Sequence, residues 1–152
     1  MQVPDQIERE VVIDAPVERV WALITEAEHL GAWFADSGAE IDLRPGGALV
    51  MHWAEHGTAR GRIERIEPHR LLSLRWAPFT EPGGAEPTEG NSTLVEFTLA
   101  AEDDGTRLRV VESGFAELAC PDEQKLENLE GNTEGWTMEF GHLVEYAGRV
   151  AA

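Results

Sequence analysis

The order of its predicted elements is the feature that most constrains the fold of this chain. Apolar patterning marks a strand at residues 7–13, then two short helices, then six strands between 39 and 115, and finally a long helix. Short connections between the later strands favour an antiparallel sheet over βαβ units. Apolar residues recur on the last helix at steps of three and four and so share one face: Trp136, Phe140, Leu143, Val144 and Ala147. The sequence therefore predicts an α+β fold in which a seven-stranded sheet packs on one amphipathic helix.

Local signals predict where the helices begin and end. Asp14 stands two residues before Pro16, which predicts an N-cap followed by the first turn of a helix. Residues 25–28 have the form of a capping box and predict the start of a second short helix. The Glu-Gly-Asn stretch at 130–132 is expected to interrupt the C-terminal helical region, with the main helix resuming near Thr133.

Length and composition set the broad class. The 152 residues fit a single domain, 1–152, with an ordered core expected from about residue 7 to 150. Cys120 is the only cysteine, so neither an internal disulfide nor a zinc-type cysteine cluster is expected. The polar first residues and the lack of a long apolar run predict a cytoplasmic protein. A net charge of −17 argues against nucleic acid and anionic membranes as partners.

Several catalytic and cofactor motifs are missing from the sequence. It contains no GxSxG, no Walker-type loop, no HExxH and no dinucleotide-binding glycine pattern after a strand. The five histidines lack ligand spacing, so no metal and no cofactor are predicted. The Pro-, Gly- and Glu-rich loop at 78–91 is either a lid over a pocket or a tolerated insertion.

Side-chain alternation singles out Glu112. In the strand that ends near residue 115, Arg107 and Arg109 should face water, so Leu108, Val110 and Glu112 should point inward. A carboxylate on an apolar face is costly unless it is paired or protonated. Glu112 is therefore the candidate catalytic residue, and the alternative is a structural pairing or an end of the alternation near Gly114.

The same alternation places aromatic residues on the interior face. Leu49, Met51 and Trp53 are predicted to face inward in their strand, which leaves His52 outside. Aromatic side chains suit both a core and an apolar ligand pocket. The candidate ligand-binding residues are Trp33, Phe34, Met51, Trp53, Trp76, Phe97, Val110, Glu112, Trp136 and Phe140.

Short motifs over residues 7 to about 150 resemble a known superfamily. They are DAPVERVW at 14–21, LGAWF at 30–34, DLRPGG at 42–47, GRIERI at 61–66 with PHRL at 68–71, GTRL at 105–108 with SGF at 113–115, and EGW at 134–136. In number, order and spacing they resemble the helix-grip superfamily (START-like, SRPBCC, Bet v 1-like), within it the branch similar to activators of the Hsp90 ATPase. The resemblance implies a bent seven-stranded antiparallel sheet wrapped around a long C-terminal helix, with two short helices after the first strand and a cavity between sheet and helix.

The resemblance leaves the activity open, because a fold does not determine a function. The first hypothesis is the binding of a small, mainly apolar molecule in the cavity. The second is an enzyme of the cyclase or dehydratase kind on a polyketide-like substrate, with Glu112 as general acid or base. The third is a co-chaperone-like interaction module, for which contact with a chaperone or a second copy is unproven. The sequence shows no additional N-terminal domain of the kind such co-chaperones carry, which speaks against the third hypothesis.

Overall fold

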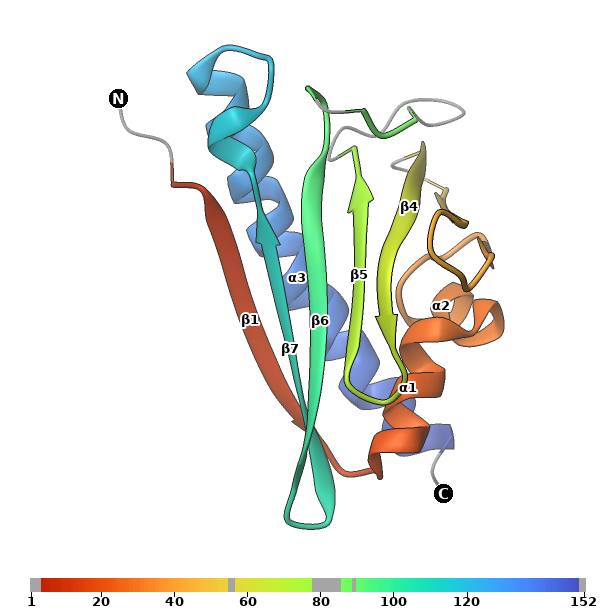
Figure 1. Ribbon diagram of the computed structural model, residues 1–152. Helices are drawn as coiled ribbons and strands as arrows, with labels where there is room; N and C mark the ends of the chain where they lie inside the picture. Colours follow the sequence, from red (N-terminus) through yellow and green to blue (C-terminus); the bar gives the residue numbers. More distant parts are fainter. Residues whose placement is uncertain (1–3, 55–56, 78–85, 89, 151–152) are drawn as a thin grey trace.

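The protein forms one antiparallel sheet in the computed structural model, which describes residues 4–54, 57–77, 86–88 and 90–150. The strands lie in the order β1-β7-β6-β5-β4-β3-β2 (Figure 1). Their bounds are Gln6–Ile13 for β1, Ala39–Ile41 for β2, Ala48–Trp53 for β3, Gly57–Glu67 for β4, Leu71–Trp76 for β5, Thr93–Glu102 for β6 and Gly105–Ser113 for β7. The seven-stranded α+β fold predicted from the sequence is confirmed.

Helices occur before and after the central strands. Between β1 and β2 lie α1 (Val17–Thr25) and α2 (Ala27–Trp33), and after β7 follow a short 3-10 turn, η1 (Phe115–Glu117), and α3 (Asp122–Val150). Figure 1 shows α3 running along one face of the sheet. Because α2 contacts α3 as well as β2 and β3, it lies beside the helix at the β2 end of the sheet.

Three predictions about helix ends were wrong. The N-cap position of α1 is Pro16, and no side chain caps it, so Asp14 does not have the expected role. The hydroxyl of Thr25 donates to the carbonyl of Trp21 at 2.7 Å instead of capping α2, whose N-cap position is Glu26. Helix α3 continues through residues 130–132 without a break. Tertiary contacts of α3 outweigh the roughly 1 kcal/mol cost of a glycine within a helix.

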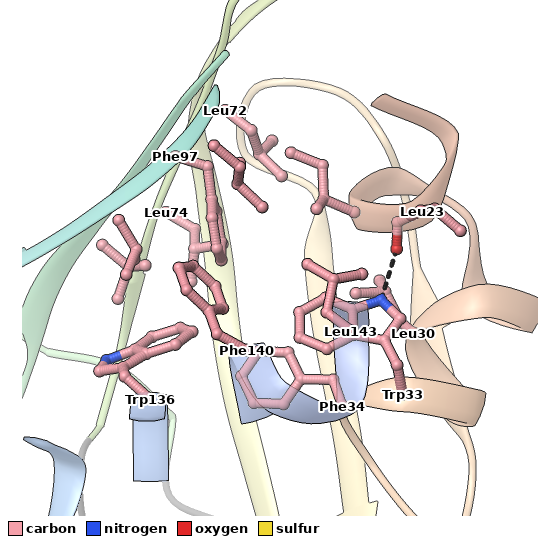
Figure 2. Close-up of a cluster of buried hydrophobic side chains, with 14 of the residues drawn as sticks. Leu23, Leu30, Trp33, Phe34, Leu72, Leu74, Phe97, Trp136, Phe140 and Leu143 are labelled. Carbon is pink, nitrogen blue, oxygen red and sulfur yellow. Dashed lines mark hydrogen bonds between the residues drawn. The ribbon is translucent and has the colours of Figure 1, made fainter. Parts of the chain in front are cut away.

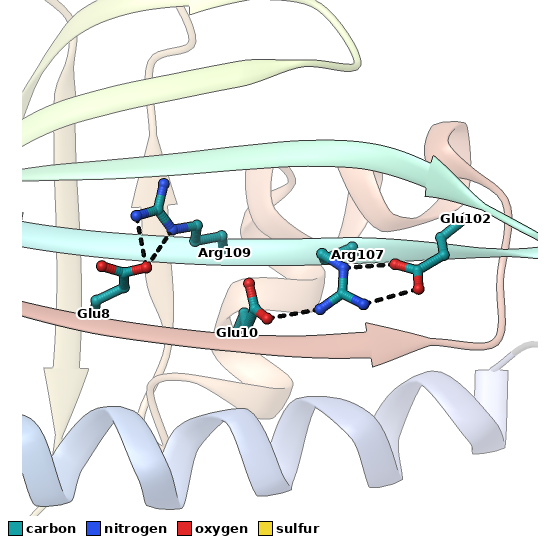
Figure 3. A network of polar contacts seen from close by, with 5 residues as sticks. All are labelled: Glu8, Glu10, Glu102, Arg107 and Arg109. Atoms are coloured by element: carbon teal, nitrogen blue, oxygen red, sulfur yellow. Dashed lines mark hydrogen bonds and ion pairs between the residues drawn. The ribbon is translucent and has the colours of Figure 1, made fainter.

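The alternation of side chains in the sheet is confirmed. Leu108, Val110 and Glu112 are fully buried on β7, whereas its arginines lie on the outer face, where they pair with acidic residues of neighbouring strands (Figure 3). Arg107 contacts Glu10 at 2.6 Å and Glu102 at 2.5 Å. The hydrogen bond from Arg107 lowers the pKa of Glu102. The outer face is thus held by ion pairs, and the inner face is left for packing.

The inner face of the sheet packs on α3 through large apolar side chains (Figure 2). Trp136, Phe140, Leu143 and Ala147 are each at most 3% exposed. Val144 was expected on the same face, but it is 44% exposed, so that prediction was wrong. Val144 lies at the edge of the apolar stripe of α3, so its side chain points to one side of the sheet and not into the core. On β3, Leu49 and Met51 are buried as predicted.

In the turn before β3, a Cβ on Gly47 would lie 1.9 Å from the carbonyl oxygen of Asp42, so only glycine fits there. The hypothesis of a lid at 78–91 falls mainly on residues 78–85 and 89, which lie outside the described residues.

Candidate functional site

A pocket of about 880 Å³ lies between α2, one end of the sheet and α3. Residues 32–36 at the end of α2 form one wall, and Trp53, Ala59 and Trp76 bring in β3, β4 and β5. The opposite wall is the face of α3 that begins at Gly131 and ends at Arg149. Three separate parts of the chain thus border a pocket whose volume is within the size range of small-molecule sites.

Aromatic rings form the inner wall of this pocket, and Phe34 is at their centre. Its ring centroid lies 5.6 Å from that of Trp53, 5.8 Å from Trp76 and 5.3 Å from Trp136, in edge-to-face geometry each time. Trp33 stacks on Phe34 at 4.9 Å. Edge-to-face and offset-stacked pairs are the favoured arrangements of aromatic rings. The wall is therefore apolar and already packed before any molecule binds.

Hydrogen bonds to the backbone fix two of the indoles. The Nε1–H of Trp33 donates to the carbonyl of Leu23 at 2.7 Å (Figure 2), and that of Trp53 donates to the carbonyl of Phe34 at 3.0 Å. A buried indole N–H normally has such a partner. The bonds satisfy the one polar atom of each ring, so the rest of both rings can pack as apolar surface.

The other two indoles are held by Glu112. The Nε1–H of Trp136 donates to Oε1 at 2.9 Å, and the Nε1–H of Trp76 donates to Oε2 at 2.8 Å. The two rings stack with centroids 5.6 Å apart and planes 25° apart. One buried carboxyl group on β7 thus fixes the orientation of two rings that line the pocket, one on β5 and one on α3.

The carboxyl group of Glu112 is otherwise enclosed by neutral donors. The hydroxyl of Thr93 donates to Oε2 at 2.6 Å, and the side-chain amide of Asn132 lies 3.1 Å from each oxygen. Burial raises the pKa of Glu112, while the hydrogen bonds from Thr93, Trp76, Trp136 and Asn132 lower it. Both oxygens are therefore engaged, in an arrangement suited to positioning the indoles.

The structure divides the candidate residues from the sequence into two groups. Among the residues that line the pocket are Trp33, Phe34, Trp53, Trp76 and Trp136. The described lining does not include the other five, which are at most 4% exposed and lie in the core around it: Met51, Phe97, Val110, Glu112 and Phe140. Five candidate residues thus form the pocket wall and five lie in the core around it, while the catalytic role of Glu112 stays a prediction.

Sequence reasoning missed Glu139. It lies on α3, lines the pocket and is only 8% exposed. Burial raises the pKa of Glu139 to about 7, and the negative charge of Asp36 adds to this rise. The available signal was its position three residues after Trp136, which puts both on one side of the helix. Because α3 is rich in acidic residues, a glutamate at this position is expected on the solvated face of the helix.

Among the residues that the structure describes, no group of three or more His, Cys, Asp or Glu side chains is placed to hold a metal ion. Within the same residues, none of the helices combines the length and the apolar character that crossing a bilayer requires.

Comparison with solved structures shows the same fold in several bacterial proteins. CalU16 from Micromonospora echinospora is 26% identical with a TM-score of 0.69, over 93% of this chain and 75% of that one. MLL2253 from Mesorhizobium loti is 23% identical with a TM-score of 0.77, over 95% of this chain and 97% of that one. The Aha1 dimer from Colwellia psychrerythraea is 16% identical with a TM-score of 0.69, over 92% and 93%. A comparison with curated proteins found no match.

A family model decides the classification. It matches residues 14–148, which include all the helices and strands except β1 and the last residues of α3. The matched region therefore contains every wall of the pocket except its last residue, Arg149. The chain belongs to the family of activator of Hsp90 ATPase homolog 1-like proteins.

Proposed function

We propose that this protein binds a small, mainly apolar molecule in the pocket between the sheet and α3. The single observation that supports the proposal best is the volume of about 880 Å³ lined by Trp33, Phe34, Trp53, Trp76 and Trp136. Such a pocket binds by shape and by removal of apolar surface from water. A cytoplasmic location, expected from the sequence, is part of this proposal.

The experiment uses a pair of glycines on α3. Gly135 lines the pocket, Gly141 does not belong to its described lining, and a Cβ at either position would have no neighbour within 4 Å. Gly135→Leu therefore places a side chain in the pocket, whereas Gly141→Leu makes the same helix substitution outside it. The neutral dye N-phenyl-1-naphthylamine, which fluoresces in apolar surroundings, reports the binding.

The dye is expected to bind the natural protein and to quench its tryptophan fluorescence. Gly135→Leu should raise the dissociation constant at least about tenfold, equal to about 1.4 kcal/mol, and Gly141→Leu should change it less than about twofold. A ligand at 100 times its dissociation constant should add about 2.7 kcal/mol to the stability. Failure of the dye to bind, or equal effects of the two leucines, would contradict the proposal.

An enzymatic function is the second candidate, with Glu112 as general acid or base on a polyketide-like substrate. Burial raises the pKa of Glu112 above its ordinary value, in the direction that a general acid requires. Glu112→Gln should then abolish turnover and leave the affinity within about tenfold. Equal loss of both would support binding alone.

A contact with a chaperone is the third candidate, and the family to which the chain belongs favours it. The test is the ATPase rate of a purified Hsp90 with and without this protein. A rate that is unchanged at saturating protein would exclude the activity.

A further inference from the structure

Glu139 is buried in the pocket wall with only one of its two oxygens engaged. Oε1 lies 3.1 Å from Nδ1 of His142 on the same helix. Oε2 is the one buried side-chain nitrogen or oxygen in the described part of the chain that has no hydrogen-bond partner. Such an atom is costly to leave unpaired. A donor from a bound molecule would remove that cost, and the soft terminal torsion of a glutamate lets the carboxyl group turn toward it.

The charges around Glu139 select the kind of donor. The pocket lining holds four carboxyl groups, those of Asp36, Glu134, Glu139 and Glu145, and one guanidinium group, that of Arg149. Arg149 lies 3.4 Å from Glu145, which reduces its effect on the rest. Asp36, at the end of α2, acts on Glu139 strongly enough to contribute to the shift in its pKa. This part of the pocket therefore favours a cation over an anion.

The aromatic wall adds to the same preference. The rings of Phe34, Trp76 and Trp136 lie within 6 Å of one another, and all three line the pocket. Faces of such rings attract ammonium groups. The rest of a cationic ligand would find apolar surface around the same rings.

We infer that the ligand is an apolar molecule with a basic amino group, and that its ammonium ion is bound by the Glu139 carboxylate. This inference rests on the proposed function, because it assigns one end of the same pocket. The ammonium donates to Oε2, and the apolar part lies among Phe34 and the indoles. Asp36 supplies a second negative charge across the pocket.

The inference predicts a direction for the effect of pH. With a pKa of about 7, Glu139 is mainly protonated at pH 6 and mainly ionised at pH 8. An alkylammonium ion stays charged over this range, as lysine does. Affinity for the cation should therefore rise about tenfold from pH 6 to pH 8. His142 and Asp36 face the same carboxyl group, so His142→Asn and Asp36→Asn are measured alongside.

The test compares dansylcadaverine with its N-acetyl derivative. The two probes share the same fluorescent ring system, but only the first carries an ammonium group. The variants are Glu139→Gln and, as a control for the overall negative charge, Glu127→Gln, an exposed position on α3 outside the described lining. Binding is measured by dansyl emission at about 0.15 M salt, which screens distant charges.

At pH 8 dansylcadaverine should bind at least about tenfold more tightly than the acetylated probe. Glu139→Gln should reduce this ratio to about one and leave the acetylated probe unchanged, while Glu127→Gln should preserve the ratio. A ratio near one in the natural protein, or a ratio that Glu139→Gln does not alter, would overturn the inference. When the inference is overturned in this way, the proposed function still stands if the acetylated probe binds and is displaced by N-phenyl-1-naphthylamine. If neither probe binds, the inference is overturned, and the proposed function falls with it only if N-phenyl-1-naphthylamine also fails to bind.

Discussion

Glu112→Leu tests whether one buried carboxyl group positions the two stacked indoles of the pocket. The substitution removes five hydrogen bonds, donated by Trp76, Trp136, Thr93 and, twice, by Asn132. The hydroxyl of Thr93 can rotate to another acceptor and the partly exposed Asn132 can reach water. The two indole N–H groups stay buried without a partner.

The expected loss of stability follows from those two unpaired indole N–H groups. Each unpaired buried donor costs about 1–3 kcal/mol, so two cost about 2–6 kcal/mol. This loss is partly offset, because leucine is buried more favourably than a carboxyl group whose pKa burial raises. We expect a net loss of about 2–4 kcal/mol in the free energy of unfolding.

Urea denaturation followed by tryptophan fluorescence and circular dichroism measures the change. Glu96→Leu is the matched control, because Glu96 lies on the adjacent strand β6 with its side chain on the outer face, and the substitution should cost at most about 0.5 kcal/mol. A double-mutant cycle with Trp136→Phe, which removes one donor, should show a coupling energy of at least about 1 kcal/mol. A loss below about 1 kcal/mol for Glu112→Leu, or additive effects in the cycle, would refute the positioning role.

Three further substitutions test the packing, the charges and the helix. Trp136→Ala should cost about 3–5 kcal/mol of unfolding free energy in the same assay, since the side chain is 3% exposed, and a loss below about 1 kcal/mol would mean that the ring is not an anchor. Glu139 has a folded-state pKa of about 7, above its ordinary value of 4.5, so the native state binds the extra proton and stability should fall as pH rises through this range. From pH 5 to pH 8, the free energy of unfolding measured by urea titration should fall by about 1–3 kcal/mol less in Glu139→Gln than in the natural protein. Parallel plots of unfolding free energy against pH for the two proteins would exclude the raised pKa. Gly141→Ala, at an exposed helical position with open space around it, should raise the melting temperature through a gain of about 0.5–1 kcal/mol, which a decrease would contradict.

The inward position of Glu112 was predictable because a strand reverses its side chains at every residue. Once Arg107 and Arg109 are assigned to water, the parity of Leu108, Val110 and Glu112 follows. The partners of Glu112 were not predictable, because β5, β6 and α3 contribute them from distant parts of the chain. The same limit applies to Glu139, whose burial depends on the approach of residues 32–36 to α3.

The predicted break in α3 shows how tertiary contacts change a local preference. Glycine at 131 weakens a helix, and the sequence has no local feature that offsets this cost. In the fold, Asn132 is held by Glu112 and Trp136 is buried on the next turn, so the helix continues. The capping signals at Asp14 and residues 25–28 failed because each depends on a weak local hydrogen bond.

Periodicity alone determined the number of strands, the inward faces of the sheet and, apart from Val144, the stripe of α3, since these depend on the fixed geometry of strands and helices. Only the tertiary structure decided where the pocket lies, which rings line it and which carboxyl groups are buried beside it. Those features depend on how segments far apart in the sequence approach one another, and neither residue spacing nor composition encodes those distances.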